Sequence, residues 1–248
     1  MEKLVVGVSC EAIFNITNQD LSLNDKLNQG TETSILVKGP MFDFVKRLSL
    51  LTDYQSDFCV EIVIVSDLSP FLASSLFDSF EYYQLLVSQV ILTGGRSIRN
   101  YLKALEIDLY FSGYTHLIRS AQSVGVLAGI VPRDRIVPDY RLAFDHRLFS
   151  DEGGYLALGK LLPLLGLFQR DKQGVKVGII TTRYYSLETW VKDLFKSAEC
   201  RVDEICFLGS GGCDEVFRLF NFMIYFEGIE RDDILGTPPA PCLLNIDF

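Results

Sequence analysis

Two stretches of the chain have the same order of features: "ILTGGRSIRNYLKALEIDLYFSG" (residues 91–113) and "CFLGSGGCDEVFRLFNFMIYFEG" (residues 206–228). Each begins with an apolar run typical of a β-strand, continues through a glycine-rich turn into a helix-length segment, and ends in a second apolar run. Their final glycines, Gly113 and Gly228, lie 115 positions apart. The sequence therefore predicts two copies of one strand, turn, helix and strand unit.

The same offset of 115 recurs upstream. "VEIVIVSD" (60–67) corresponds to "VKVGIITT" (175–182), and the helix-like segment that starts at Gly39 corresponds to the one that starts at Gly154. Apolar strands that alternate with amphipathic helices are typical of a mainly parallel sheet covered by helices. We therefore predict an α/β fold of two similar Rossmann-like halves that arose by internal duplication.

The boundaries of these halves follow from the repeat. We predict a first half over residues 1–131, a connection over 132–140 that carries two prolines, and a second half over 141–248. The first half differs by a polar insert of about twenty residues after its first strand, which reads as a mobile flap or a solvated surface loop.

Composition limits the kinds of partner. With 248 residues, 48% of them hydrophobic, the chain can bury a substantial core. A formal net charge of −9 without a run of lysines or arginines argues against nucleic acid or an anionic membrane as a partner. The six cysteines form no CxxC framework, and no apolar segment approaches about 18 residues, so we expect a cytoplasmic protein with reduced thiols.

Several predicted strands end in residues suited to binding an anion. In parallel α/β sheets, ligands gather at the carboxyl ends of the strands. Hydroxyls, exposed backbone amides and an arginine at these ends suit phosphate. The candidate phosphate- or nucleotide-binding residues are Thr93, Gly94, Gly95, Thr181, Thr182, Arg183, Gly211 and Gly212. The alternative is that these residues form ordinary turns and helix caps.

The order of motifs resembles that of a known enzyme family. The motifs include "VSCEAIFNI" (8–16), "GPMFDFVKRL" (39–48), "LTGGRSIRNYLKA" (92–104), "AFD" followed by "LFSDE" (143–152) and "IITTR" (179–183). Together they resemble the cytosolic 5'-nucleotidase type I family, a branch of the haloacid dehalogenase-like phosphatases. The resemblance implies a Rossmann-like (HAD-like) fold and Mg²⁺-dependent hydrolysis of nucleoside monophosphates.

The resemblance also implies roles for single residues. In the family, the first aspartate of a D-x-D pair attacks phosphorus and the second protonates the leaving oxygen. Asp145 occupies the nucleophile position, and Thr181 occupies the position of the hydroxyl that binds the phosphoryl group. Asp145 and Glu227 would be the metal ligands that remain.

Three positions depart from the family pattern. Arg147 stands where the family has its general acid, Cys213 where it has a lysine, and Gly228 where it has a second acidic residue. An arginine cannot act as an acid near neutral pH, because its pKa exceeds about 12. We expect Arg147 to form an ion pair with Asp145 instead.

Two functions remain open on these residues. One is a noncatalytic family member without a cofactor, which binds a nucleoside monophosphate or phosphate and acts as a binding or regulatory subunit. Such a subunit would act as a homo-oligomer or with a protein partner. The other is an active Mg²⁺-dependent 5'-nucleotidase that forms an aspartyl-phosphate on Asp145, with His146, Glu230 or Asp232 in the missing roles.

Overall fold

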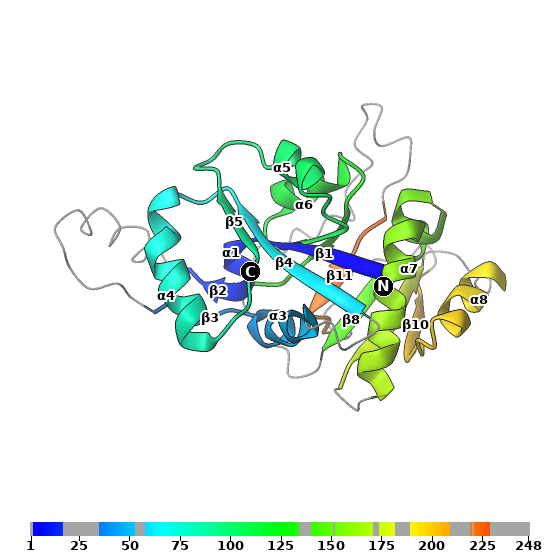
Figure 1. Cartoon of the computed structure of the whole chain (residues 1–248). Coiled ribbons are helices and arrows are strands. Elements are labelled where there is room, and N and C mark those ends of the chain that lie inside the picture. Colours follow the sequence, from blue (N-terminus) through cyan, green and yellow to red (C-terminus); the bar gives the residue numbers. More distant parts are fainter. Residues whose placement is uncertain are drawn as a thin grey trace. The chain divides into compact units, whose positions relative to one another are not determined.

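The computed structural model describes residues 2–16, 35–52, 58–133, 140–150, 152–170, 174–181, 189–208, 219 and 221–228. The chain forms two compact units, Met1–Ile136 (unit 1) and Val137–Phe248 (unit 2). Figure 1 colours both along the sequence, with unit 1 in blue to green and unit 2 in green to orange. None of the helices in the described part of the chain is long and apolar enough to span a membrane.

Unit 1 is built around a parallel sheet. Among its described residues the strands run in the order β7 (Leu127–Ile130), β6 (Leu109–Ser112), β1 (Glu2–Val8), β4 (Phe58–Ser66) and β5 (Gln89–Leu92). All neighbouring strands in this order are parallel. The central strands, β1 and β4, are rich in valine and isoleucine because both of their faces are covered.

Helices cover both faces of the unit 1 sheet. They are α1 (Cys10–Ile13), α3 (Phe42–Ser49), α4 (Ala73–Tyr83), α5 (Arg99–Ala104) and α6 (Thr115–Gln122), with short 3-10 turns η2 (Leu50–Thr52) and η3 (Pro70–Leu72). Helices α5 and α6 pack on the face that carries Val5 and Val63. On the other face, the Phe14 ring lies 5.7 Å from Phe42 of α3 and 5.9 Å from Phe80 of α4. Figure 1 shows α3 on the side of β4 opposite to α5 and α6. A short antiparallel pair, β2 (Phe14–Asn15) and β3 (Val37–Lys38), precedes α3.

Unit 2 also contains a parallel sheet. Its described strands run in the order β10 (Glu204–Phe207), β9 (Lys176–Thr181), β8 (Arg141–Asp145) and β11 (Ile224–Phe226). The connecting elements are η4 (His146–Ser150), α7 (Glu152–Arg170) and α8 (Thr189–Ser197). The paired residues Phe144 and Phe226 stack with ring centroids 4.8 Å apart. The predicted α/β fold with mainly parallel strands is confirmed.

The two units share strand order and register. The matching Cα pairs are Val6 with Ile62, Val6 with Leu109 and Val63 with Gln89 in unit 1, and Leu142 with Val177, Leu142 with Ile224 and Gly178 with Glu204 in unit 2. Every position after the first strand differs by 115 between the units. Positions in the first strand differ by 136, because only unit 1 carries the polar insert. The strands β6, β1, β4 and β5 therefore have defined counterparts in β11, β8, β9 and β10.

Local backbone conformations agree as well. Gln84 and Glu199 both end a helix in the left-handed conformation, with φ of 53° and 50°. Glu106 and Asn221, also 115 positions apart, have φ of 50° and 45°. Few residues other than glycine adopt this conformation, so the coincidence at matching positions indicates the same chain path in both units.

Candidate functional site

Asp145 is the last residue of β8, and its side chain lies at the carboxyl edge of the unit 2 sheet. The strand reads "RLAFD", in which Leu142 to Phe144 are buried and Asp145 is 5% exposed. Asp145 is paired with Ile180 of β9, so Thr181 follows at the end of the neighbouring strand. Glu227 follows directly after β11, which pairs with β8 on the other side. The structure therefore brings Asp145, Thr181 and Glu227 to one edge of the sheet.

Both carboxylate oxygens of Asp145 accept hydrogen bonds. The backbone N–H of Arg147 donates to Oδ1 at 2.8 Å. Nε and Nη2 of Arg147 donate to Oδ2 at 2.9 and 2.6 Å, and the Tyr225 hydroxyl donates to the same oxygen at 3.1 Å. The Nδ1 atom of His146 lies 3.4 Å from Oδ1. The expected ion pair of Arg147 with Asp145 is thus confirmed, and it is a charge-assisted contact in which two guanidinium N–H groups donate to one carboxylate oxygen.

The tight turn η4 explains how Arg147 reaches back to Asp145. It begins directly after β8, so the backbone folds over the strand end within two residues. Burial lowers the pKa of Arg147, but the hydrogen bonds and charge of Asp145, with Tyr225 and Glu227, raise it above its ordinary value overall. Burial, and then the charge of Asp145, raise the pKa of Tyr225 well above its ordinary value. Arg147 is therefore permanently charged, and Tyr225 is a permanent donor.

Gly228 is held against the same turn. A Cβ atom at this position would lie 2.5 Å from the Cβ of Arg147 and 2.8 Å from the backbone nitrogen of Leu148. These distances are far below van der Waals contact, so no acidic side chain fits here unless the turn moves. In this arrangement, glycine is a packing requirement of the turn that carries Arg147.

The residues of this edge do not fit Mg²⁺. The ion prefers a near-octahedral set of oxygen ligands at about 2.0–2.1 Å. Here the oxygens of Asp145 already accept four hydrogen bonds, and the Nη2 atom of Arg147 lies 3.9 Å from Oε1 of Glu227. Across the described ranges there is no group of three or more histidine, cysteine, aspartate or glutamate side chains placed to hold a metal. The guanidinium of Arg147 thus lies near both Asp145 and Glu227, where these two carboxylates would otherwise face Mg²⁺.

The other predicted binding residues lie in unit 1 or outside the described residues. Thr93, Gly94 and Gly95 belong to unit 1, where they form the turn after β5. The amides of Gly94 and Gly95 donate to the carbonyls of Leu68 and Asp67 at 3.0 and 2.6 Å. The Thr93 hydroxyl donates to the carbonyl of Arg96 at 2.5 Å. Their polar groups therefore stabilise the turn itself. Thr182, Arg183, Gly211, Gly212, Cys213, Glu230 and Asp232 lie outside the described residues.

A second polar centre, in unit 1, was not singled out from the sequence. Glu11 is buried, and its Oε1 atom accepts hydrogen bonds from the hydroxyls of Ser9 and Ser112 and from the amide of Gly113. Its Oε2 atom has no hydrogen-bond partner. Burial raises the pKa of Glu11, and the bonds from Ser112 and Ser9 offset this only in part.

Tyr225 was missed as well, although the repeat carries a signal for it. Its counterpart 115 positions earlier is Tyr110, which is also buried in the strand next to the first one. The Tyr110 hydroxyl donates to the carbonyl of Val65 at 2.7 Å, whereas that of Tyr225 donates to Asp145. The repeated "YF" in "DLYFSG" and "MIYFEG" therefore marks two buried donors.

Comparisons with known proteins agree with the motif order. The model of the 5'-nucleotidase family matches residues 1–158, which include Asp145 and Arg147 but not Thr181 or Glu227. Human cytosolic 5'-nucleotidase 1B is 29% identical over 171 residues, which cover 60% of this chain and only 28% of the relative. Among solved structures, a Listeria monocytogenes protein assigned as a UDP-N-acetylglucosamine 2-epimerase matches 84% of this chain and 70% of that chain. Its 10% identity and TM-score of 0.28 carry no argument. The family match covers more than half of the chain, and the chain therefore belongs to the 5'-nucleotidase family.

Proposed function

We propose that this chain binds a nucleoside monophosphate or phosphate with lost or much reduced hydrolysis, and acts as a binding, regulatory or partner subunit. The observation that carries the proposal is the engagement of both Asp145 oxygens by Arg147. We also propose that the chain is cytoplasmic, because the name of the human relative describes that protein as cytosolic. A homo-oligomer and a complex with another protein are both compatible with such a role.

The ion pair opposes catalysis in two ways. A nucleophilic carboxylate must present a lone pair to phosphorus at about 3–3.5 Å, and the oxygens of Asp145 instead accept four hydrogen bonds. Arg147 also cannot protonate a leaving oxygen, because its pKa is raised rather than lowered. Loss of a general acid alone costs about 10²–10⁴ in rate.

The same edge keeps features that suit an anion. Arg147 supplies a fixed positive charge, and its side chain is 25% exposed. Thr181 supplies a hydroxyl at the end of the neighbouring strand. We infer that phosphate binds at this edge through Arg147 and Thr181, assisted by Thr182, Arg183 and the amides of Gly211 and Gly212. Thr93, Gly94 and Gly95 stay predictions for unit 1.

The active Mg²⁺-dependent nucleotidase remains the second candidate. Family membership and the position of Asp145 beside Thr181 and Glu227 favour it. It requires Arg147 to leave Asp145 before the carboxylate can react and before Asp145 and Glu227 can hold the ion.

Thermal unfolding with ligands tests the binding proposal. A ligand that binds only the folded state stabilises it by RT ln(1 + [L]/Kd), so nucleoside monophosphates and inorganic phosphate should raise the melting temperature. The shift should be the same with and without Mg²⁺. Thr181→Val should reduce it, because the variant keeps the shape but lacks the hydroxyl.

Ser66→Ala is the matched control, since Ser66 occupies the position of Thr181 in unit 1 and should leave the shift unchanged. No shift at millimolar ligand would refute the binding proposal. A shift that appears only with Mg²⁺ would favour the active nucleotidase.

We further infer that the two units arose by duplication. The equal strand order, the offset of 115 shared by β4, β5 and β6 with β9, β10 and β11, and the matching left-handed residues support this origin.

A further inference from the structure

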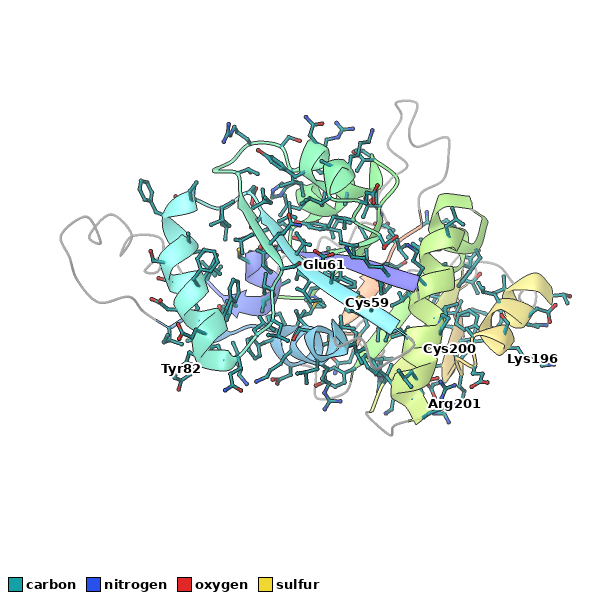
Figure 2. The ribbon with its side chains drawn as sticks, in the orientation of Figure 1. Cys59, Glu61, Tyr82, Lys196, Cys200 and Arg201 are labelled. Atoms are coloured by element: carbon teal, nitrogen blue, oxygen red, sulfur yellow. The ribbon has the colours of Figure 1, made fainter. Side chains whose placement is uncertain are left out.

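Unit 2 has a pocket between helix α8 and strand β10. Its volume is about 390 Å³, within the range of about 300–1,000 Å³ that is usual for small-molecule sites. Its lining residues are Lys192, Phe195, Lys196, Cys200, Val202, Ile205 and Phe207. Phe207, the last residue of β10, is paired with Thr181, and the described hydrogen bonds and ion pairs of Asp145 involve none of the lining residues. Figure 2 labels Lys196 on α8 and Cys200 in the turn that follows.

The floor of the pocket is apolar and only partly covered. Ile205 and Phe207 lie on one face of β10 and are 40% and 49% exposed, which is high for large apolar side chains in a sheet. Phe195 and Cys200 are buried beside them. Burial raises the pKa of the Cys200 thiol to about 12, so it contributes as an apolar group and not as a thiolate.

The wall of the pocket carries two cations. Lys192 and Lys196 are four residues apart on α8 and therefore share one face of the helix. Neither forms an ion pair with any residue that the structure describes, whereas nearby Arg170 and Arg201 are paired with Glu199 and Asp203. In a chain with a net charge of −9, two unpaired lysines at an apolar pocket favour an anion with an apolar body.

The counterpart in unit 1 indicates that the fold does not require these lysines. The residues 115 positions before Lys192 and Lys196 are Phe77 and Glu81, on helix α4. There the Phe77 ring packs edge-on against Phe80 at 6.0 Å. The same place in the repeat thus carries an aromatic ring and an acid in unit 1, and two cations in unit 2.

We propose that the α8–β10 pocket binds an amphipathic anion. Its carboxylate or phosphate lies between Lys192 and Lys196, and its alkyl or aryl body covers Phe195, Ile205 and Phe207. The proposal does not depend on nucleotide binding at the Asp145 edge.

Titration of the purified full chain with octanoate, octyl phosphate and octan-1-ol tests the proposal. Trp190, the only tryptophan of the chain, is part of α8, so its fluorescence reports on this helix, and calorimetry gives the dissociation constant independently. Both anions should bind, and octan-1-ol about tenfold more weakly, since it lacks the charge. The tighter of the two anions identifies the head group.

Two double variants complete the test. Lys192→Gln with Lys196→Gln should weaken octanoate binding about tenfold. Arg99→Gln with Lys103→Gln, which removes two cations from α5 in unit 1, should leave it unchanged. The proposal is overturned if neither anion binds at millimolar concentration, if octan-1-ol binds as tightly, or if the α8 variant binds like the parent.

Discussion

The two units share one backbone plan but place different polar groups, an acid and a guanidinium, at the same position after their first strand. Unit 1 continues from β1 with Ser9, Cys10 and Glu11, whereas unit 2 continues from β8 with Asp145, His146 and Arg147. By the strand registers, Glu11 and Arg147 are counterparts. Glu11 is surrounded by hydroxyl and amide donors, and Arg147 by carboxylates.

In each unit, neighbouring residues of the same unit satisfy the central polar group. Ser112, which donates to Glu11 in unit 1, has Glu227 as its counterpart in unit 2. A hydroxyl donor thus lies beside the acid of unit 1, and an acid lies beside the arginine of unit 2. In a hydrolase, the end of such a strand offers charged groups to the substrate. In this chain, the polar groups at the strand end are bonded to other residues of the same unit. The comparison teaches that one loop position, two residues after the strand, decides whether an acid or a guanidinium lies at the centre of this edge.

The largest expected difference between the units is the effect of removing the group at the end of the first strand. Asp145→Asn leaves the Arg147 cation without its charged partner, which should lower the free energy of unfolding by about 3 kcal/mol. Ser9→Ala removes one neutral donor from Glu11 and should cost about 1 kcal/mol. Urea unfolding measures both. If Asp145→Asn is as stable as the parent or more so, the carboxylate is strained as in an active site, and the structural ion pair is refuted.

Gly113 and Gly228, which are counterparts in the two units, allow a second comparison. At Gly228 an added Cβ would meet the backbone nitrogen of Leu148 at 2.8 Å, whereas at Gly113 the closest atoms belong to the flexible side chain of Arg133. Gly228→Ala should therefore lower the free energy of unfolding by about 1–3 kcal/mol, and Gly113→Ala by less than about 1 kcal/mol. Equal costs in the same urea series would show that the turn at Arg147 is not fixed against Gly228.

The free energy of unfolding should depend on pH through Glu11, the buried acid of unit 1. Burial raises the pKa of Glu11 in the folded protein, so the uncharged form is favoured there. Its contribution to stability is fully present below the unfolded pKa of about 4.3 and is lost as pH rises through the folded pKa. Glu11→Gln does not titrate and should therefore gain stability relative to the parent as pH rises from the unfolded pKa to the folded pKa. Within the window between the two pKa values, the gain is about 1.4 kcal/mol per pH unit. Parallel stability curves for the two proteins would contradict the buried, uncharged acid.

Features that depend on local sequence were predictable, and features that depend on distant contacts were not. The offset of 115 predicted the repeated α/β pattern, and the spacing of Asp145 and Arg147 predicted their ion pair. Two of the donors to Glu11, Ser112 and Gly113, come from about 100 residues away, and no periodicity reveals them.

The contacts of the glycines in the two units were likewise not predictable from the sequence. The contact of Gly228 with Arg147 arises only because β11 pairs with β8. The pattern "TGG" at Thr93 fits a phosphate loop and an ordinary turn equally well. In the structure the two glycine amides donate to the carbonyls of Asp67 and Leu68, contacts that the pattern does not reveal.

Restoring the family's acid should return metal affinity but not activity. Arg147→Asp removes the internal cation and places a third carboxylate near Asp145 and Glu227, so Mg²⁺ should raise the melting temperature of this variant and not of the parent. Hydrolysis should stay undetectable, because Cys213 still replaces the lysine of the family. Phosphate release by Arg147→Asp would show that the arginine alone blocks the reaction.

The most direct test of the central claim is a phosphate-release assay of the unmodified protein with a panel of nucleoside monophosphates, with and without Mg²⁺. We predict no release above the background of a heat-denatured sample, while the same monophosphates raise the melting temperature. Release at about 1 s⁻¹ or faster, the lower end of typical enzyme turnover, would contradict the account. The contradiction would be complete if that activity required Mg²⁺ and disappeared in Asp145→Asn.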